Sequence, residues 1–282
     1  MKNNSFNKAI DKYLKEFLNT PSDDLEYLEK FYTTPQIDMT NYHEWGIFST
    51  PIFGIHYYSF WYNPNYNDFE KIIDSFIMSF IAQIMYLYDN KKSFIQVLPD
   101  AVPLFLAILT FGNRKEIDLM FNAVINLIHN NIINNNAVNH RDKTLQEAFL
   151  IYDLCTDNKK HKIWEKYIEI PLHENYRRCL DVILSDDEKD VSSILSEMMK
   201  YHRKTAHIES FTKNEFYPIE WRVLPIEIIV LIRYRYHQGK SIDFIKDEVL
   251  SKFVPYLKKD KYTLSPKIEE AKMKMYEMLS LS

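Results

Sequence analysis

Histidine side chains are the residues of this sequence whose type could support metal chemistry, so their spacing is decisive. The chain has 9 histidines. A helical zinc site needs ligands about one turn apart, as in His-Glu-x-x-His. Here His202 and His207 are five positions apart, and that pattern occurs nowhere in the sequence. His43 and His173 each directly precede a glutamate, which is not a ligand spacing either. We therefore expect surface or capping histidines, no metal and no cofactor.

The two cysteines, Cys155 and Cys179, give no sign of covalent or redox chemistry. They lack a Cys-x-x-Cys spacing, and Cys155 falls at the apolar end of an expected helix, where a buried thiol is usually inert. The fingerprints of serine hydrolases, phosphate loops and dinucleotide sites do not occur. Reduced thiols without an apolar leader segment are typical of a cytoplasmic protein. We expect that the chain is not an enzyme, because a helical hydrolase would need a polar pocket with a strongly shifted carboxylate or histidine.

Acidic residues gather most densely in the cluster Asp186, Asp187, Glu188 and Asp190. A helix is expected to begin there, and negative charge near a helix N-terminus is favoured by the backbone dipoles. That structural role accounts for the cluster. The alternative is an exposed acidic patch that contacts a partner, and the sequence leaves both interpretations open.

Apolar residues recur at three- and four-residue steps through most of the chain, which is the pattern of amphipathic helices. The longest stripe covers residues 68–88, and no alternation of period two extends beyond a few residues. Prolines and glycines interrupt an aromatic-rich stretch over residues 33–66, for which we expect an irregular connection or a short helix pair. The pattern predicts an all-α protein, with further helices over residues 6–18, 25–31, 104–111, 114–129, 144–155, 161–172, 175–183, 188–201 and 265–281.

The segment that follows Pro225 is expected to form the central helix of the fold. Proline suits a first helical turn, and Gly239 suits the residue after a helix end, where a left-handed conformation is common. Residues Ile228 to Ile232 are apolar on every side of a helix. Such a helix is stable when neighbours enclose it, so we expect the other helices to surround it.

Three apolar segments end at a short polar turn that is followed by a charged helix, over residues 106–113, 151–158 and 181–188. Antiparallel helical hairpins packed side by side produce this pattern. We therefore expect an irregular array of antiparallel helical hairpins around a buried C-terminal central helix. Residues 1–66 are assigned to N-terminal helices and the aromatic segment, and residues 67–282 to the hairpin domain, with both parts in one compact unit.

The charge balance constrains the partners of the chain. A net charge of −4 and a pI near 6.2 do not suggest a nucleic-acid binder, which is normally basic. The apolar stretches are broken by Asp, Pro or Arg before they reach membrane-spanning length. We expect neither nucleic acid nor membrane as a partner, and the sequence does not specify the oligomeric state.

The segment from Leu224 to Tyr234, continued by His237 to Ile242, resembles the C-terminal signature of immunity proteins from bacterial polymorphic toxin systems, specifically immunity family forty-nine. The family pattern is an apolar helix, a Tyr/His-x-x-Gly element and a Tyr-Leu-Pro-like ending. Residues 253–257 stand in place of that ending, with the proline one step displaced. The charged turns at 112–114 and 185–187 also resemble the turns of this family, whereas the N-terminal aromatic segment has no counterpart.

The resemblance implies a non-enzymatic inhibitor that binds a secreted antibacterial toxin, such as a nuclease, and occludes its active site. Acidic patches near helix starts would attract a basic toxin and accelerate encounter. Charge clustering beside the expected central helix then nominates the toxin-contacting residues, which are Asp186, Asp187, Glu188 and Asp190, followed by Glu215, Glu220 and Trp221.

A helical-repeat adaptor or scaffold, which binds a peptide or a regulatory partner in a concave face, is the alternative function. Neither function involves catalysis. They differ in one consequence, because only an immunity protein protects cells from one particular toxin.

Overall fold

The computed structural model describes residues 3–18, 26, 28, 30–31, 39, 42–89, 98–129, 142–156, 174–206, 216 and 219–280, and these residues contain helices and no strand. The all-α prediction is therefore confirmed. The chain forms two compact units, one made of Met1–Phe94 with Lys261–Ser282 and the other of Ile95–Asp260. The boundary expected at residue 66 lies inside the first unit, where it separates two helices that pack on each other.

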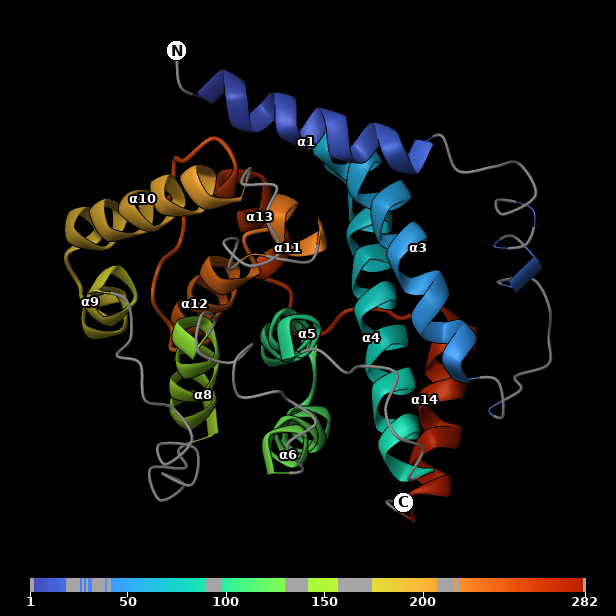
Figure 1. Ribbon diagram of the computed structural model, residues 1–282. Helices are drawn as coiled ribbons and strands as arrows, with labels where there is room; N and C mark the ends of the chain where they lie inside the picture. Colours follow the sequence, from blue (N-terminus) through green and yellow to red (C-terminus); the bar gives the residue numbers. More distant parts are fainter. Residues whose placement is uncertain are drawn as a thin grey trace. The chain divides into compact units, whose positions relative to one another are not determined.

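The first unit is built on α3 (Tyr42–Tyr62) and α4 (Tyr66–Tyr88), which lie side by side in Figure 1. The N-terminal helix α1 (Asn3–Leu18) packs on α3, and the C-terminal helix α14 (Pro266–Met278) packs on α4. Helix α4 is long and apolar enough to cross a membrane by length and composition, but 72% of its apolar window is buried. Core helices of folded domains meet the same criteria, so packing within the first unit is enough to explain its composition.

Helix α3 corrects the expectation of an irregular segment over residues 33–66, because residues 42–62 form one continuous helix that contains Pro51. Aromatic rings stack along its length, with centroids 5.1 Å apart for Phe53 and Tyr57 and 6.2 Å apart for Tyr57 and Trp61. The proline removes the amide that would bond the carbonyl of Ile47. Ile47 is 53% exposed, so that turn of the helix faces water. The free energy gained by burying the stacked rings of Phe53, Tyr57 and Trp61 outweighs the cost of the hydrogen bond lost at the proline.

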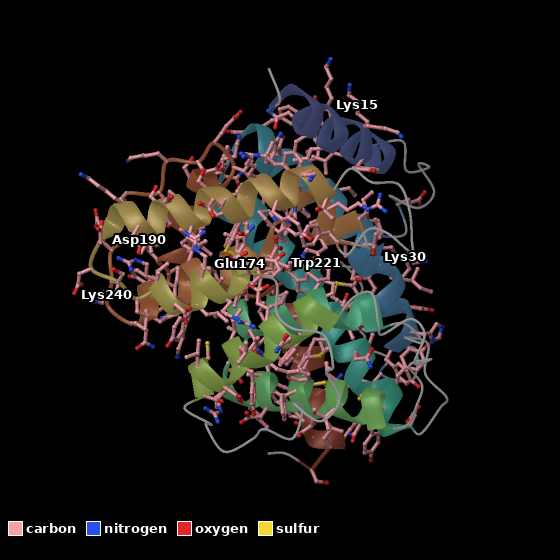
Figure 2. The ribbon with its side chains drawn as sticks, turned by 60° about the vertical axis from the view of Figure 1, so that its left-hand side comes forward. Lys15, Lys30, Glu174, Asp190, Trp221 and Lys240 are labelled. Carbon is pink, nitrogen blue, oxygen red and sulfur yellow. The ribbon has the colours of Figure 1, made fainter. Side chains whose placement is uncertain are left out.

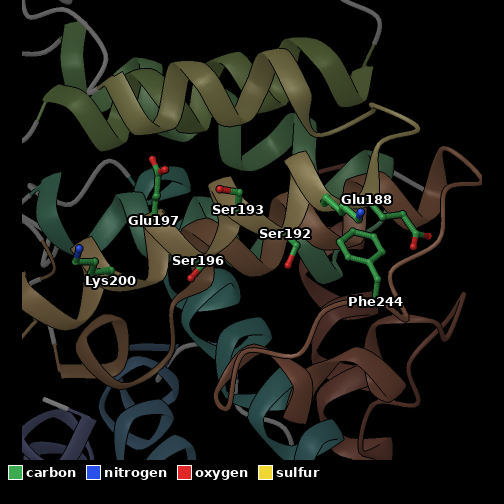
Figure 3. A pocket seen from close by; sticks show the side chains of 8 residues that line it. Glu188, Ser192, Ser193, Ser196, Glu197, Lys200 and Phe244 are labelled. Atoms are coloured by element: carbon green, nitrogen blue, oxygen red, sulfur yellow. The ribbon is translucent and has the colours of Figure 1, made fainter. Parts of the chain in front are cut away.

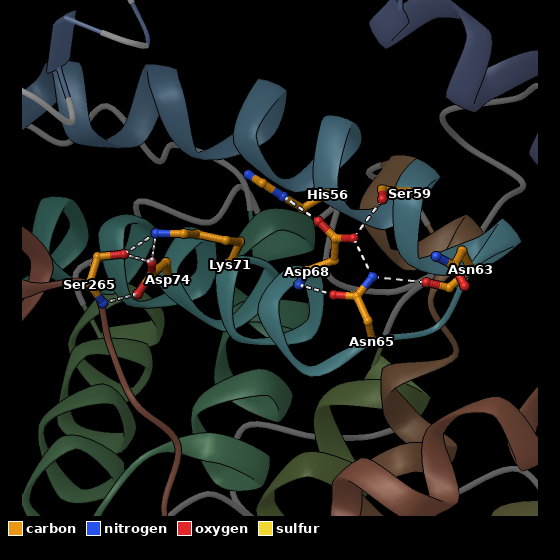
Figure 4. Close-up of polar contacts among 8 residues, drawn as sticks. All are labelled: His56, Ser59, Asn63, Asn65, Asp68, Lys71, Asp74 and Ser265. Carbon is orange, nitrogen blue, oxygen red and sulfur yellow. Dashed lines mark hydrogen bonds and ion pairs between the residues drawn. The ribbon is translucent and has the colours of Figure 1, made fainter.

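The start of α4 is fixed by a polar cluster around Asp68 (Figure 4). Asn65 is the N-cap, and its Oδ1 accepts a bond from the amide of Asp68 at 2.9 Å. The Asp68 carboxylate in turn accepts bonds from Ser59 Oγ at 2.5 Å and Asn65 Nδ2 at 2.6 Å, and it contacts Nδ1 of His56 at 2.8 Å. The cluster therefore joins the end of α3 to the beginning of α4.

Replacing Asp68 with asparagine is expected to lower the stability of the first unit by about 1–3 kcal/mol at neutral pH, because it weakens this buried cluster. Burial by itself would raise the pKa of Asp68, but the bonds from His56, Ser59 and Asn65 outweigh it and hold the pKa below its ordinary value. Its contribution is therefore present above the ordinary carboxyl pKa and is lost as pH falls through the folded-state pKa. Urea unfolding at several pH values should show a weaker acid dependence in the variant, and an unchanged dependence would contradict this role.

The C-terminal segment returns to the first unit through a second cluster on α4, also drawn in Figure 4. The Asp74 carboxylate is buried, accepts the amide of Ser265 at 3.0 Å and lies 3.3 Å from Nζ of Lys71. Glu70 accepts the amide of Thr263 at 3.0 Å. Burial raises the pKa of Asp74, although the contacts with Ser265 and Lys71 oppose that change. These bonds hold the start of α14 against α4.

The second unit contains the expected central helix, α12 (Ile226–His237). It packs against α5 (Leu98–Phe111), α8 (Asp142–Thr156), α10 (Glu188–Thr205) and α13 (Leu250–Leu257). Its residues from Ile226 to Arg235 are all buried, which confirms the prediction of an enclosed helix. Pro225 occupies the N-cap position, one residue before the helix, and Gly239 has a φ of 74° beyond its end.

Two pairs of neighbouring helices in this unit pack around short polar turns. Helices α5 and α6 (Arg114–His129) flank Asn113, whose Oδ1 accepts the amide of Glu116 at 3.0 Å, while Glu116 accepts the amide of Asn113 at 2.7 Å. Helices α9 (Glu174–Val182) and α10 flank the acidic cluster. The short helix α11 (Ile219–Val223) precedes α12. The wider array of hairpins stays a prediction, and the helix expected over residues 161–172 lies outside the described residues.

Candidate interaction surface

Arg235, near the C-terminal end of α12, holds two surface segments together. Its Nη1 donates to the carbonyl oxygens of Ile183 at 2.6 Å and Ser185 at 2.8 Å, and its Nε donates to that of Ser241 at 2.7 Å. Its guanidinium carbon lies 5.2 Å from the ring centroid of Phe244. Arg235 therefore ties the turn before α10 to the loop after α12, a role more specific than that of a cation near a helix C-terminus.

The acidic cluster begins with two residues that already have partners in the fold. Asp187 is the N-cap of α10, and its Oδ1 accepts the amides of Lys189 at 2.9 Å and Asp190 at 3.3 Å. Asp186 forms an ion pair with Nζ of Lys240 at 2.5 Å. The hydrogen bond and charge of Lys240 lower the pKa of Asp186. The structural interpretation of the cluster therefore applies to this part of it.

The other expected contact residues differ in exposure. Glu188 and Asp190 are exposed on the first turn of α10, and Glu220 is half-buried on α11. Trp221 is only 2% exposed, and its Nε1 donates to Oε2 of Glu227 at 2.8 Å. This tryptophan belongs to the core, so the expectation of a surface contact was wrong for it. Glu215 lies outside the described residues.

Figure 2 shows the same contrast, with Asp190 and Lys240 reaching outward on one side of the second unit and Trp221 lying among the helices. The exposed carboxylates of α10 and the loop after α12 thus share one surface. Trp221 is buried, and its ring centroid lies 5.5 Å from that of Phe216. It is part of the hydrophobic core and not of the exposed surface.

An open hollow of about 630 Å³ runs along the outer side of α10, as Figure 3 shows. Helix α10 supplies seven of its lining residues and the loop after α12 supplies the ring of Phe244. The α10 residues are charged or carry hydroxyl groups: Glu188, Lys189, Ser192, Ser193, Ser196, Glu197 and Lys200. We call this hollow the α10 groove. The exposed acids and the groove together make up the candidate interaction surface.

Sequence reasoning identified the acidic end of this surface and missed the groove. Ser192 and Ser196 are four residues apart and therefore share one face of α10. That spacing was the available signal. The place of Phe244 beside this face depends on Arg235 and leaves no local pattern in the sequence.

Two groups of potentially reactive residues are withdrawn from the surface among the described residues: the cysteines, of which Cys179 is buried and Cys155 half-buried, and the pair of His202 with Glu227. Burial raises the pKa of the Cys155 thiol to about 12, and burial together with Glu147 raises that of Cys179, so neither is a reactive thiolate. His202 contacts Oε1 of Glu227 through Nδ1 at 2.7 Å and the carbonyl oxygen of Arg222 through Nε2 at 3.1 Å. Both side chains are 0% exposed, so this pair supports the core and has no access to a substrate.

Within the described part of the chain, no group of three or more His, Cys, Asp or Glu side chains is placed to hold a metal ion. No protein-family model matches this sequence, and neither a curated protein nor a solved structure matches it significantly.

Proposed function

We propose that this chain is an immunity protein that binds a cognate secreted antibacterial toxin and neutralises it by occluding its active site. The proposed place of action is the cytoplasm, where the chain would meet toxin made by the same cell. The exposed surface formed by the first turn of α10 and the groove carries the proposal, because Arg235 fixes its two sides relative to each other.

A surface that is formed before binding supports tight association, since little conformational entropy is lost when the partner arrives. Helix α10 is capped at its start by Asp187, and Glu197 along its length forms an ion pair with Arg178 of α9 at 2.9 Å. The exposed charges of Glu188 and Asp190 would accelerate encounter with a basic partner. The resemblance at residues 224–242 supports the choice of a toxin as that partner.

The double charge reversal Glu188→Lys/Asp190→Lys is expected to weaken toxin binding by about tenfold to a thousandfold, because two attractive contacts become repulsive. This variant should no longer protect cells that express the toxin. Its melting temperature should change little, since both side chains are exposed. Asp187 is unsuitable for this test because its loss would also remove the cap of α10.

The matched control is Glu277→Lys, an exposed residue of α14 in the first unit. It should retain full protection. Equal protection by the wild type and the double variant would remove α10 from the interface, and a wild type that protects against no neighbouring toxin would favour the adaptor function. An adaptor would use the same groove for a peptide of another partner.

A further inference from the structure

The lysines of the α10 groove differ from its glutamates in their surroundings. Glu197 is paired with Arg178, whereas Glu188 has no ion pair among the described residues and only its charge acts on Arg235, where it opposes part of the lowering of the Arg235 pKa by burial. Neither Lys189 nor Lys200 has an ion-pair or hydrogen-bond partner for its ammonium group within the described structure. With Glu197 paired, Lys189 and Lys200 outnumber Glu188 among the remaining charges of the lining, so the net charge left for a ligand along the groove is positive. The exposed carboxylates of Glu188 and Asp190 form an acidic rim at one end of it.

The spacing of these two ammonium groups gives the groove a length. Lys189 and Lys200 are eleven residues apart on one helix, which places their backbones about 16 Å apart at the helical rise. An extended chain covers that distance in about five residues.

The hydroxyl groups between the lysines indicate the conformation of the ligand. Ser192, Ser193 and Ser196 line the groove and have no hydrogen-bond partner among the described residues for their hydroxyl groups. Each hydroxyl can donate to a carbonyl and accept from an amide, which are the groups that an extended backbone exposes. A helical ligand has its backbone groups already bonded and would need an apolar stripe, whereas Phe244 is the one aromatic or aliphatic residue of the lining.

We propose that the α10 groove binds an extended peptide segment of the partner that carries two carboxylates about five residues apart. One carboxylate pairs with Lys189 and the other with Lys200, and the backbone between them bonds the serine hydroxyls. An apolar side chain of the segment lies against Phe244. The inference deepens the proposed function and rests on it for the identity of the partner. Basic residues of the same partner then contact the acidic rim, Glu188 and Asp190. The opposite charges of the rim and of the groove lysines fix the direction of the bound peptide along α10.

The test uses a phage-displayed library of random dodecapeptides, selected on the full-length protein without any toxin. Enriched peptides should carry pairs of Asp or Glu about five positions apart, and their enrichment should fall at least tenfold on Lys189→Glu/Lys200→Glu. The control Lys8→Glu/Lys15→Glu makes the same charge change on exposed residues of α1 and should select the wild-type peptides. Fluorescence anisotropy with one enriched peptide should show binding that weakens with added salt.

A second variant tests the groove without changing its charge. Ser196→Trp should fill the hollow and prevent selection, while Ser196→Ala should preserve most of it. The inference would be overturned if the enriched peptides lacked paired acidic residues, or if no peptide were enriched at all. It would also be overturned if Lys189→Glu/Lys200→Glu selected the same peptides as the wild type. If acidic peptides are selected and no toxin is bound, the groove inference stands and the immunity function falls. Toxin binding that survives Lys189→Glu/Lys200→Glu would instead exclude the groove inference and leave the immunity function in place.

Discussion

Replacing Glu227 with alanine is expected to lower the free energy of unfolding of the second unit by about 3–5 kcal/mol, the usual cost of removing one partner from a buried ion pair. Glu227 accepts from Trp221 and contacts His202, and all three side chains are at most 2% exposed. The variant would leave both partners without their acceptor in a place that water does not reach. Hydrogen exchange of peptides from α12 at increasing urea concentrations would measure the loss.

The geometry explains why the intact pair is tolerated in the core. Nε2 of His202 faces a carbonyl oxygen and so carries a proton, and the contact between Nδ1 and Glu227 needs a second proton, which either group can hold. In both forms the pair has no net charge. Its burial therefore avoids the cost of an isolated charge.

Because the pair acts as a unit, the effects of changing its two members should not add. The double variant His202→Phe/Glu227→Met is expected to lose less stability than the sum of the losses in His202→Phe and Glu227→Met, with a coupling free energy of about 1–3 kcal/mol. Glu197→Ala, which breaks a half-exposed ion pair between α9 and α10, should cost at most about 1 kcal/mol. Additive single losses would show that the two side chains do not depend on each other.

Arg235→Met should also destabilise the second unit, by about 3–5 kcal/mol, because it leaves three carbonyl oxygens without their charged donor. The effect should be strongest where those carbonyls lie. Hydrogen exchange is expected to accelerate in residues 183–190 and 241–246 at denaturant concentrations that leave α12 protected. Arg177→Met, at an exposed position of α9, is the control. Uniform acceleration throughout the second unit would mean that Arg235 stabilises the core without fixing the surface.

The central helix could be predicted from the sequence because its signals are local. A proline before the first residue and a glycine beyond the last mark its ends, and the apolar run from Ile228 to Ile232 leaves no polar face. The roles of Arg233 and Arg235 were not predictable in this way. Each bonds carbonyl oxygens of other segments, with Arg233 reaching those of Leu257 and Lys259, and the loops that supply them are arranged only in the folded chain.

Helix α3 escaped prediction because turn signals outweighed a weak periodicity. Pro51, Gly46 and Gly54 are typical of loops. Aromatic residues occur on several sides of the helix, so the sequence shows no single apolar stripe of the kind that marks an amphipathic helix. In the folded chain the aromatic side chains of Tyr57 and Phe60 are completely buried, at 0% exposure. Packing between helices thus decides the structure of this segment, which its local propensity does not.

Only the charged part of the candidate site could be predicted from the sequence. The exposed carboxylates Glu188 and Asp190 follow from a cluster of neighbouring acidic residues in the sequence. Trp221 was misplaced because its acceptor, Glu227, comes from the next helix and draws the indole inward. The groove combines α10 with a residue of a distant loop, Phe244, and therefore required the fold.

The most direct test of the proposed function is a calorimetric titration of the full-length protein with the secreted toxin encoded beside it, in an inactive form. We predict a single complex with one toxin per chain and a dissociation constant in the nanomolar range, about 10⁻⁷–10⁻¹⁰ M, as for other preformed interfaces of standard size. Glu188→Lys/Asp190→Lys should weaken it at least tenfold. Absence of binding by the wild type, or equal affinity of the double variant, would contradict the claim that α10 binds a toxin.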